Sequence, residues 1–149
     1  MRNRTRKIAK VATLAASEER RLGEMAGRSQ QHLDAQLDRL GELNAFRHSY
    51  ATNSSTSTAM SSAHLKDYHD FLQRLDTAVQ AQQQIVRECE QNLEAHRKRW
   101  IAKRQRLESL RRVLDRYREE DELHDARMEQ KRLDDLPKSQ ATAFGADDD

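Results

Sequence analysis

The chain has 149 residues, of which 36% are hydrophobic, 35% charged and 5% aromatic, and its net charge is +2. This composition excludes a thick globular core and favours long helices that each bury one stripe. A single cysteine, Cys89, excludes an intrachain disulfide and fits a reducing compartment. Because no stretch approaches the length of an apolar membrane span, we expect no membrane insertion and a cytoplasmic protein.

The charge is segregated along the chain. Residues 1–22 carry seven bases and two acids, a net +5, and residues 23–96 carry six bases and ten acids, a net −4. Residues 97–118 carry ten bases and two acids, a net +8, and residues 119–149 carry four bases and eleven acids, a net −7. Such blocks indicate charged partners more strongly than the total does.

The first predicted helix covers residues 1–50 and has a loose hydrophobic seam. Its members are Ile8, Val11, Ala15, Leu22, Met25, Leu33, Leu37 and Leu40. Gly23, Gly27 and Gly41 each weaken this helix by about 1 kcal/mol relative to alanine. Residues 51–62 are rich in Ser and Thr, which compete for backbone hydrogen bonds, so we predict a turn there with Ser61 or Ser62 as the next N-cap.

The second predicted helix covers residues 63–136, because no Gly or Pro occurs between Gly41 and Pro137. Its seam alternates steps of three and four residues: Leu65, Tyr68, Leu72, Leu75, Val79, Gln82, Val86, Cys89, Leu93, His96, Trp100, Lys103, Leu107, Leu110, Leu114 and Tyr117. Thirteen of these sixteen positions are apolar or aromatic, which predicts a coiled coil. We expect this helix to span about 110 Å. We expect Pro137 to end it and residues 137–149 to form a disordered acidic tail.

Two helices with seams and a short polar link predict an all-α fold, a long antiparallel two-helix coiled-coil hairpin whose second helix is the longer. Folding about residue 56 would pair residue i with roughly residue 113 − i, and the second helix would overhang from about residue 112. The basic N-terminus would then face the basic segment 97–118. An anionic partner would relieve this repulsion, although the bases could also simply be solvated.

A surplus apolar surface is predicted beside the turn. Its second-helix members lie next to the seam: Phe71, Leu75, Ala78, Gln82 and Ile85. Its first-helix members are Leu43, Phe46 and Tyr50. A two-helix hairpin buries one stripe on each helix, so part of this surface should face water and form an interface. The alternative is a locally broadened core.

Catalytic and metal-binding patterns are missing from the sequence. The histidines form no ligand pair at helical i, i+4 spacing: His32, His48, His64, His69, His96 and His124. With one cysteine, a zinc site is not expected. The sequence also has no Gly-rich phosphate loop and no nucleophile elbow. We therefore expect neither an enzyme nor a cofactor.

Several segments carry a family resemblance by their order and spacing. They are Leu22-Gly-Glu-Met25, Phe46 with Tyr50, residues 68–79, Arg99-Trp100 with residues 103–107, and residues 127–135. Together they resemble the FliJ family, the small coiled-coil component of the bacterial flagellar type III export apparatus. The resemblance covers nearly the whole chain.

The resemblance implies a non-enzymatic stalk that docks into the hexameric flagellar export ATPase. It also implies a link to the cytoplasmic domain of the export gate membrane protein, and escort of flagellar export chaperones. The location would be the cytoplasmic face of the inner membrane at the flagellar base. By position, the gate-binding residues would be Leu43, Phe46, Tyr50, Phe71, Leu75, Ala78 and Gln82. The bases expected to face the ATPase are Arg6, Lys7, Lys10, Lys103, Arg104 and Arg106.

A competing hypothesis is a basic coiled coil that binds nucleic acid, or a generic scaffold. The basic blocks fit nucleic acid, whose phosphates attract cations. However, Trp100 lies on the seam, where it cannot stack on bases, and the acidic block 119–149 would repel phosphate. We therefore expect protein partners and no nucleic acid.

Overall fold

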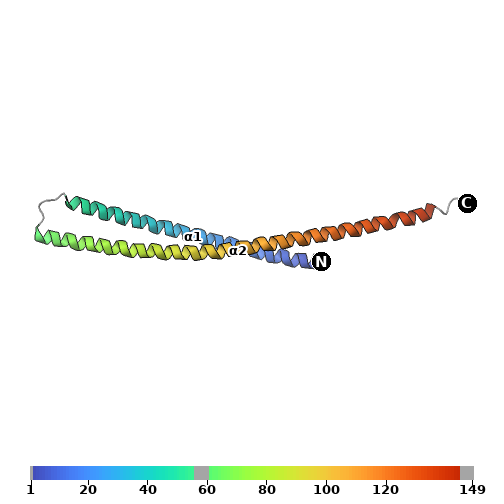
Figure 1. The fold of residues 1–149 in the computed structure, drawn as a ribbon, viewed down its shortest axis with the longest axis horizontal. Helices are drawn as coiled ribbons and strands as arrows, with labels where there is room; N and C mark the ends of the chain where they lie inside the picture. The colour runs from blue at the N-terminus through green and yellow to red at the C-terminus, as the bar shows by residue number, and fades with distance from the viewer. Residues whose placement is uncertain (1, 56–60, 145–149) are drawn as a thin grey trace. The chain divides into compact units, whose positions relative to one another are not determined.

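The computed structural model describes residues 2–55 and 61–144, with the side chains of residues 2–53 and 61–136. Two helices make up this part of the chain, α1 (Arg2–Ser55) and α2 (Ser62–Phe144). They run in opposite directions as a helical hairpin, with α2 the longer (Figure 1). The predicted all-α hairpin is confirmed.

Ser61 begins α2 as its N-cap. Its side-chain oxygen accepts a hydrogen bond from the His64 backbone N–H at 3.3 Å, and its carbonyl accepts one from the Leu65 N–H at 3.0 Å. Such bonds satisfy donors that the first turn of a helix leaves without partners.

Both helices extend further than the sequence analysis predicted. α1 continues beyond Tyr50 to Ser55, and the Thr52 hydroxyl donates to the His48 carbonyl at 2.7 Å, a bond that lets threonine stay in a helix. α2 continues through Pro137 to Phe144, because one proline removes one backbone bond without obliging the helix to end. Residues 56–60 of the predicted turn and 145–149 of the predicted acidic tail lie outside the described residues.

The hairpin divides into two compact units. The terminal unit comprises residues 1–19 and 103–149, and the turn unit comprises residues 20–102. Each unit contains a piece of both helices.

The predicted seam of α2 is buried in both units. Its buried members are Leu75, Val79, Gln82, Val86, Cys89, Leu93, Leu107 and Leu114. In the turn unit, Val86, Cys89 and Leu93 form a core cluster with Leu33 of α1. The other seam members are half-buried, except Leu65, which is exposed at the start of α2.

The seam of α1 differs from the prediction. Val11 and Leu37 are 41% and 42% exposed, although they are large and apolar. The buried residues of α1 are mostly small: Ala12, Ala15, Ala26, Leu33 and Gln36. The prediction included Ala15 and Leu33 but missed Ala12, Ala26 and Gln36. Small side chains on α1 leave room for the larger seam residues that α2 presents.

The register between the helices also differs from the prediction. It is defined by four pairs: Gln36 with Gln82, Arg47 with Asp76, Thr5 with Asp121, and Arg2 with Asp125. In these pairs the residue numbers add to between 118 and 127, so the predicted sum of about 113 is wrong. The fold point lies later because α1 ends at Ser55 and α2 begins at Ser62.

This register relieves part of the predicted like-charge contact. Arg2 and Arg4 pair with the acidic residues Asp125 and Glu120, whereas Arg6 still lies near Arg118 of the basic segment. Because Arg2 at the start of α1 meets Asp125, the overhang of α2 begins after Asp125, later than the predicted residue 112, and every residue from 122 to 136 is exposed.

Candidate interaction surfaces

Four aromatic rings gather in the turn unit, and we call them the aromatic cluster: Phe46, Tyr50, Tyr68 and Phe71. Tyr50 stacks on Tyr68 with ring centroids 5.2 Å apart and lies 4.6 Å from Phe71. Phe46 meets the edge of Phe71 at 6.4 Å. Tyr50, Tyr68 and Phe71 are half-buried, whereas Phe46 is 53% exposed. The cluster is therefore partly a broadened core and partly a surface.

The structure places the predicted gate-binding residues together in the turn unit, at different depths. Leu75 and Gln82 are buried. The half-buried members are Leu43, Tyr50, Phe71 and Ala78. Phe46 is the exposed member, and it lines a shallow groove with Arg39, Glu42, Leu43 and Gln82. Only part of the predicted set can therefore meet a partner directly.

Gln82 takes part in a buried polar layer between the helices. Its side-chain amide donates to both the carbonyl and the side-chain oxygen of Gln36, at 3.0 and 2.8 Å. Both side chains are buried, so the bonds replace those that each amide would make with water. The sequence analysis listed Gln82 on the seam and among the gate-binding residues, and it did not predict Gln36 as its partner.

Trp100 lies against Gly23 in the same unit. A Cβ atom at Gly23 would be 3.0 Å from the Trp100 indole nitrogen, closer than ordinary van der Waals contact. No such neighbour surrounds Gly27, where a Cβ would meet nothing within 4 Å. Gly23 therefore makes room for the indole ring, a packing role that the sequence analysis did not predict.

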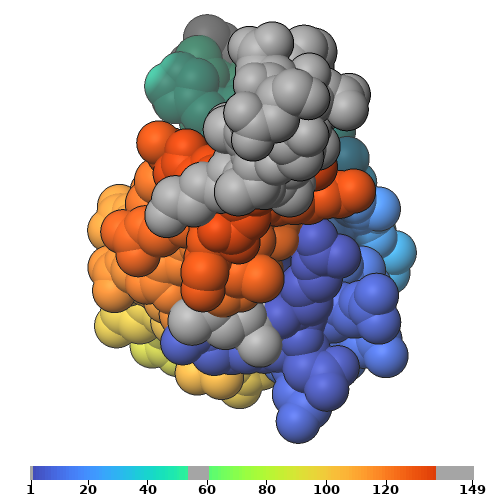
Figure 2. All heavy atoms as spheres, turned by 90° about the vertical axis from the view of Figure 1, so that its right-hand side faces the viewer, coloured from blue at the N-terminus to red at the C-terminus, as the bar shows by residue number. Residues whose placement is uncertain are grey.

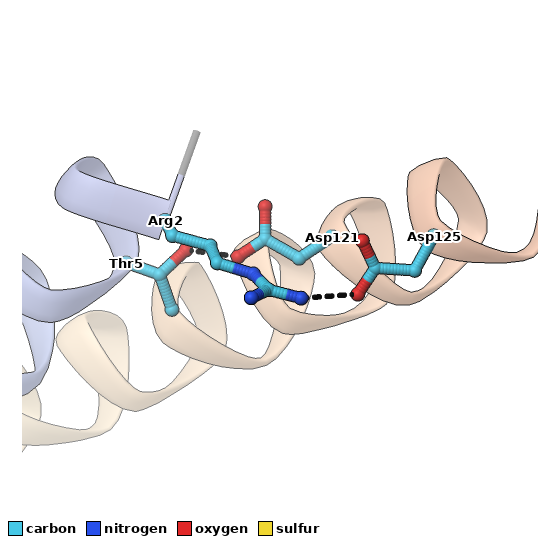
Figure 3. Close-up of polar contacts among 4 residues, drawn as sticks. All are labelled: Arg2, Thr5, Asp121 and Asp125. Carbon is cyan, nitrogen blue, oxygen red and sulfur yellow. Dashed lines mark hydrogen bonds and ion pairs between the residues drawn. The ribbon is translucent and has the colours of Figure 1, made fainter. Parts of the chain in front are cut away.

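In the terminal unit the start of α1 lies beside α2 (Figure 2, blue and orange), and polar contacts join it to residues 121 and 125. The Arg2 guanidinium donates to the Asp125 carboxylate at 2.8 Å, and the Thr5 hydroxyl donates to the Asp121 carboxylate at 2.6 Å (Figure 3). The hydrogen bond and the charge of Asp125 raise the pKa of Arg2. The charge of Arg2 is therefore partly neutralised within the hairpin.

Arg4 makes two further contacts in the terminal unit. It pairs with Glu120 through a guanidinium nitrogen, and its guanidinium carbon lies 3.7 Å from the centre of the Tyr117 ring. The second contact has the geometry of a cation–π interaction. Arg4 therefore also contributes to the contact between α1 and α2.

The bases predicted to face the ATPase all lie in the terminal unit. Arg6, Lys7, Lys10, Arg104 and Arg106 are exposed. Lys103 is half-buried, and its ammonium pairs with Glu18. Arg104 and Arg106, two residues apart on a helix, point to different sides of α2. The predicted set therefore shares one unit but not one face.

Neither helix, over its described residues, has a segment long and apolar enough to cross a membrane. In the same part of the chain, no three His, Cys, Asp or Glu side chains gather where a metal ion could bind.

Comparison with known proteins assigns the family. The sequence matches the family model described as the flagellar FliJ protein over residues 4–142. The chain belongs to the FliJ family. No curated protein matches it, and no solved structure does. A FliJ-family chain is a non-catalytic coiled-coil protein related to flagellar export.

Proposed function

We propose that this FliJ-family protein is a stalk and adaptor of the flagellar export apparatus. In this proposal the terminal unit docks into the hexameric export ATPase, and the turn unit binds the cytoplasmic domain of the export gate membrane protein. The protein also escorts flagellar export chaperones, and it works at the cytoplasmic face of the inner membrane at the flagellar base. Membership of the family supports the association with the export apparatus.

The exposure of Phe46 is the observation that carries the gate contact. Phe46 is held by Tyr50 and Phe71, 6.4 Å away in each case, so it is presented to solvent at a defined position. Aromatic side chains held rigidly beside a groove are typical binding hot spots, because they lose little entropy on binding. Leu75 is buried and would not touch the partner, whereas Gln82 is buried at the edge of the groove that Phe46 lines.

The exposed bases of the terminal unit support the ATPase contact. Arg6, Lys7 and Lys10 on α1 and Arg104 and Arg106 on α2 provide positive charge on several sides of this unit. A segment that enters a ring of subunits would meet protein on all sides, so charge distributed around it fits such a site. Exposed charges of this kind accelerate association and confer a strong salt dependence.

The gate contact is tested by Phe46→Ala, with Leu65→Ala as the matched control. Both side chains are 53% exposed and both lie in the turn unit. We expect Phe46→Ala to lower the affinity for the gate domain by about 1–2 kcal/mol, or roughly 5- to 30-fold, because a hot-spot aromatic is removed. Leu65→Ala should change it less than about threefold. The affinities are measured by titration calorimetry.

Circular dichroism should show that both variants remain helical, and a pull-down should show that both still bind the ATPase. Equal affinities of the two variants for the gate domain would contradict the proposed contact. Tight, salt-sensitive DNA binding without binding to gate or ATPase would favour the nucleic-acid hypothesis instead.

A further inference from the structure

Tyr68 belongs to the aromatic cluster but not to the predicted gate-binding residues. It lies near the start of α2 and is half-buried. Its ring stacks on Tyr50 of α1, with the centroids 5.2 Å apart and an angle of 21° between the ring planes. Its hydroxyl donates to the backbone carbonyls of Tyr50 and Ala51 at 3.5 Å, which is longer than usual for a hydroxyl donor, so both bonds are weak. Tyr68 therefore holds the end of α1 chiefly through its ring.

Tyr50 connects Tyr68 to the exposed Phe46. Its ring lies 4.6 Å from the Phe71 ring and 6.4 Å from the Phe46 ring. α1 ends at Ser55, so Tyr50 lies close to its end, where helices fray. Stacking on a ring of α2 opposes this fraying. Without Tyr68, Tyr50 would be held less firmly, and so would Phe46 beside it.

Tyr68 itself is poorly placed for direct contact with a partner. The groove beside Phe46 is lined by residues of α1 and by Gln82, and Tyr68 is not among them. Phe46 is 53% exposed, whereas Tyr68 is half-buried under Tyr50. Any effect of Tyr68 on the gate contact should therefore pass through Tyr50 to Phe46.

We infer that Tyr68 is a positioning residue for the gate contact: it stacks on Tyr50 and so orders Phe46 at the edge of the groove before the partner binds. This inference rests on the proposed gate contact and adds a residue to it. An aromatic anchor that is already ordered loses less conformational entropy when the partner binds. The stacked ring has this role and the weak hydroxyl bonds do not, so Tyr68→Phe should behave like the parent protein.

The first test measures the affinity of full-length variants for the gate domain by titration calorimetry. We expect Tyr68→Ala to lower this affinity about three- to tenfold, because Phe46 must then be ordered during binding. Tyr68→Phe should stay within about twofold of the parent protein, since it keeps the ring. An unchanged affinity in Tyr68→Ala would overturn the inference, and so would equal losses in Tyr68→Ala and Tyr68→Phe.

A double-mutant cycle tests whether Tyr68 acts through Phe46. Once Phe46 is replaced by alanine, Tyr68 has no anchor left to position. Phe46→Ala/Tyr68→Ala should therefore bind the gate domain within about twofold of Phe46→Ala alone, because coupled residues are not additive. If the two losses instead multiply, Tyr68 acts independently of Phe46 and the inference is wrong.

Val86→Ala is the control for a general loss of stability. Val86 is buried in the core cluster of the same unit, about 27 Å from Tyr68 along α2. We expect it to lower the stability but to leave the gate affinity within about twofold while the protein remains folded. Tyr68→Leu, which keeps an apolar side chain without the flat ring, replaces Tyr68→Ala if that variant does not fold, and it should still lose at least about threefold. An equal loss of affinity in Val86→Ala would make Tyr68 an ordinary stabilising residue.

Fluorine NMR with 4-fluorophenylalanine in place of Phe46 reports the order of this ring without any partner. Tyr68→Ala should narrow the signal towards that of a freely rotating ring, whereas Val86→Ala should leave it unchanged. The same signal in all three proteins would overturn the inference even if no gate domain binds. The proposed function is decided separately by Phe46→Ala: if this variant loses affinity and Tyr68→Ala does not, the gate contact stands and the positioning role fails.

Discussion

Replacing Gly23 by alanine tests the packing of the turn unit most directly. The added Cβ would lie 3.0 Å from the nitrogen of the Trp100 indole and 3.3 Å from its Cε2. The ring would have to move by a few tenths of an ångström. At Gly27, four residues further along α1, the same change meets nothing within 4 Å. The two variants therefore differ in packing while sharing the same change of backbone entropy.

The two contributions can be given magnitudes. Alanine stabilises a helix interior by about 1 kcal/mol relative to glycine, so Gly27→Ala should increase the free energy of unfolding by about that amount. Overpacking at a buried contact costs about 1–3 kcal/mol, so Gly23→Ala should range from neutral to about 2 kcal/mol destabilising. We expect Gly23→Ala to be the less stable of the two by about 1–3 kcal/mol.

Urea unfolding followed by circular dichroism measures both free energies. Repeating the comparison in a Trp100→Leu background isolates the ring, because the loss of other Trp100 contacts then affects every variant equally. In that background Gly23→Ala should stabilise the protein by about 1 kcal/mol, as Gly27→Ala does. If Gly23→Ala stabilises the parent protein as much as Gly27→Ala, the indole does not lie on Gly23 and the reasoning is refuted.

Two further predictions concern the seam, and the same unfolding assay tests both. Gln82→Leu should cost about 1–3 kcal/mol because it leaves the Gln36 amide buried without its partner, whereas adding Gln36→Leu should recover most of the loss. An equal loss in the single and double variants would contradict the buried pair. Leu107→Ala should cost about 2–4 kcal/mol, since Leu107 is 3% exposed, and Leu133→Ala should stay within about 0.5 kcal/mol, since Leu133 is 55% exposed. Similar losses at both sites would mean that residues 122–136 pack against another surface.

Part of the interaction surface was predictable from the sequence. Phe46 and Phe71 were identified because a hairpin buries one seam on each helix and these two rings lie outside the predicted seams. Their arrangement was not predictable, since Tyr50 and Tyr68 draw Phe71 into a cluster and leave Phe46 exposed. Contacts between rings on different helices depend on the register, which the periodicity of one helix does not contain.

The sequence by itself determined that the chain forms two long helices and which side of α2 is buried. Large residues such as Val79, Val86 and Leu107 recur at steps of three and four, and burying that stripe is favourable against any partner helix. Only the tertiary structure decided which residues of α1 face this stripe and how far the helices slide along each other. Small buried residues such as Ala12 carry no such signal, because an alanine is compatible with either side of a helix. The register follows from where the helices end and from how facing side chains fill the space between them, and neither is a property of one helix alone.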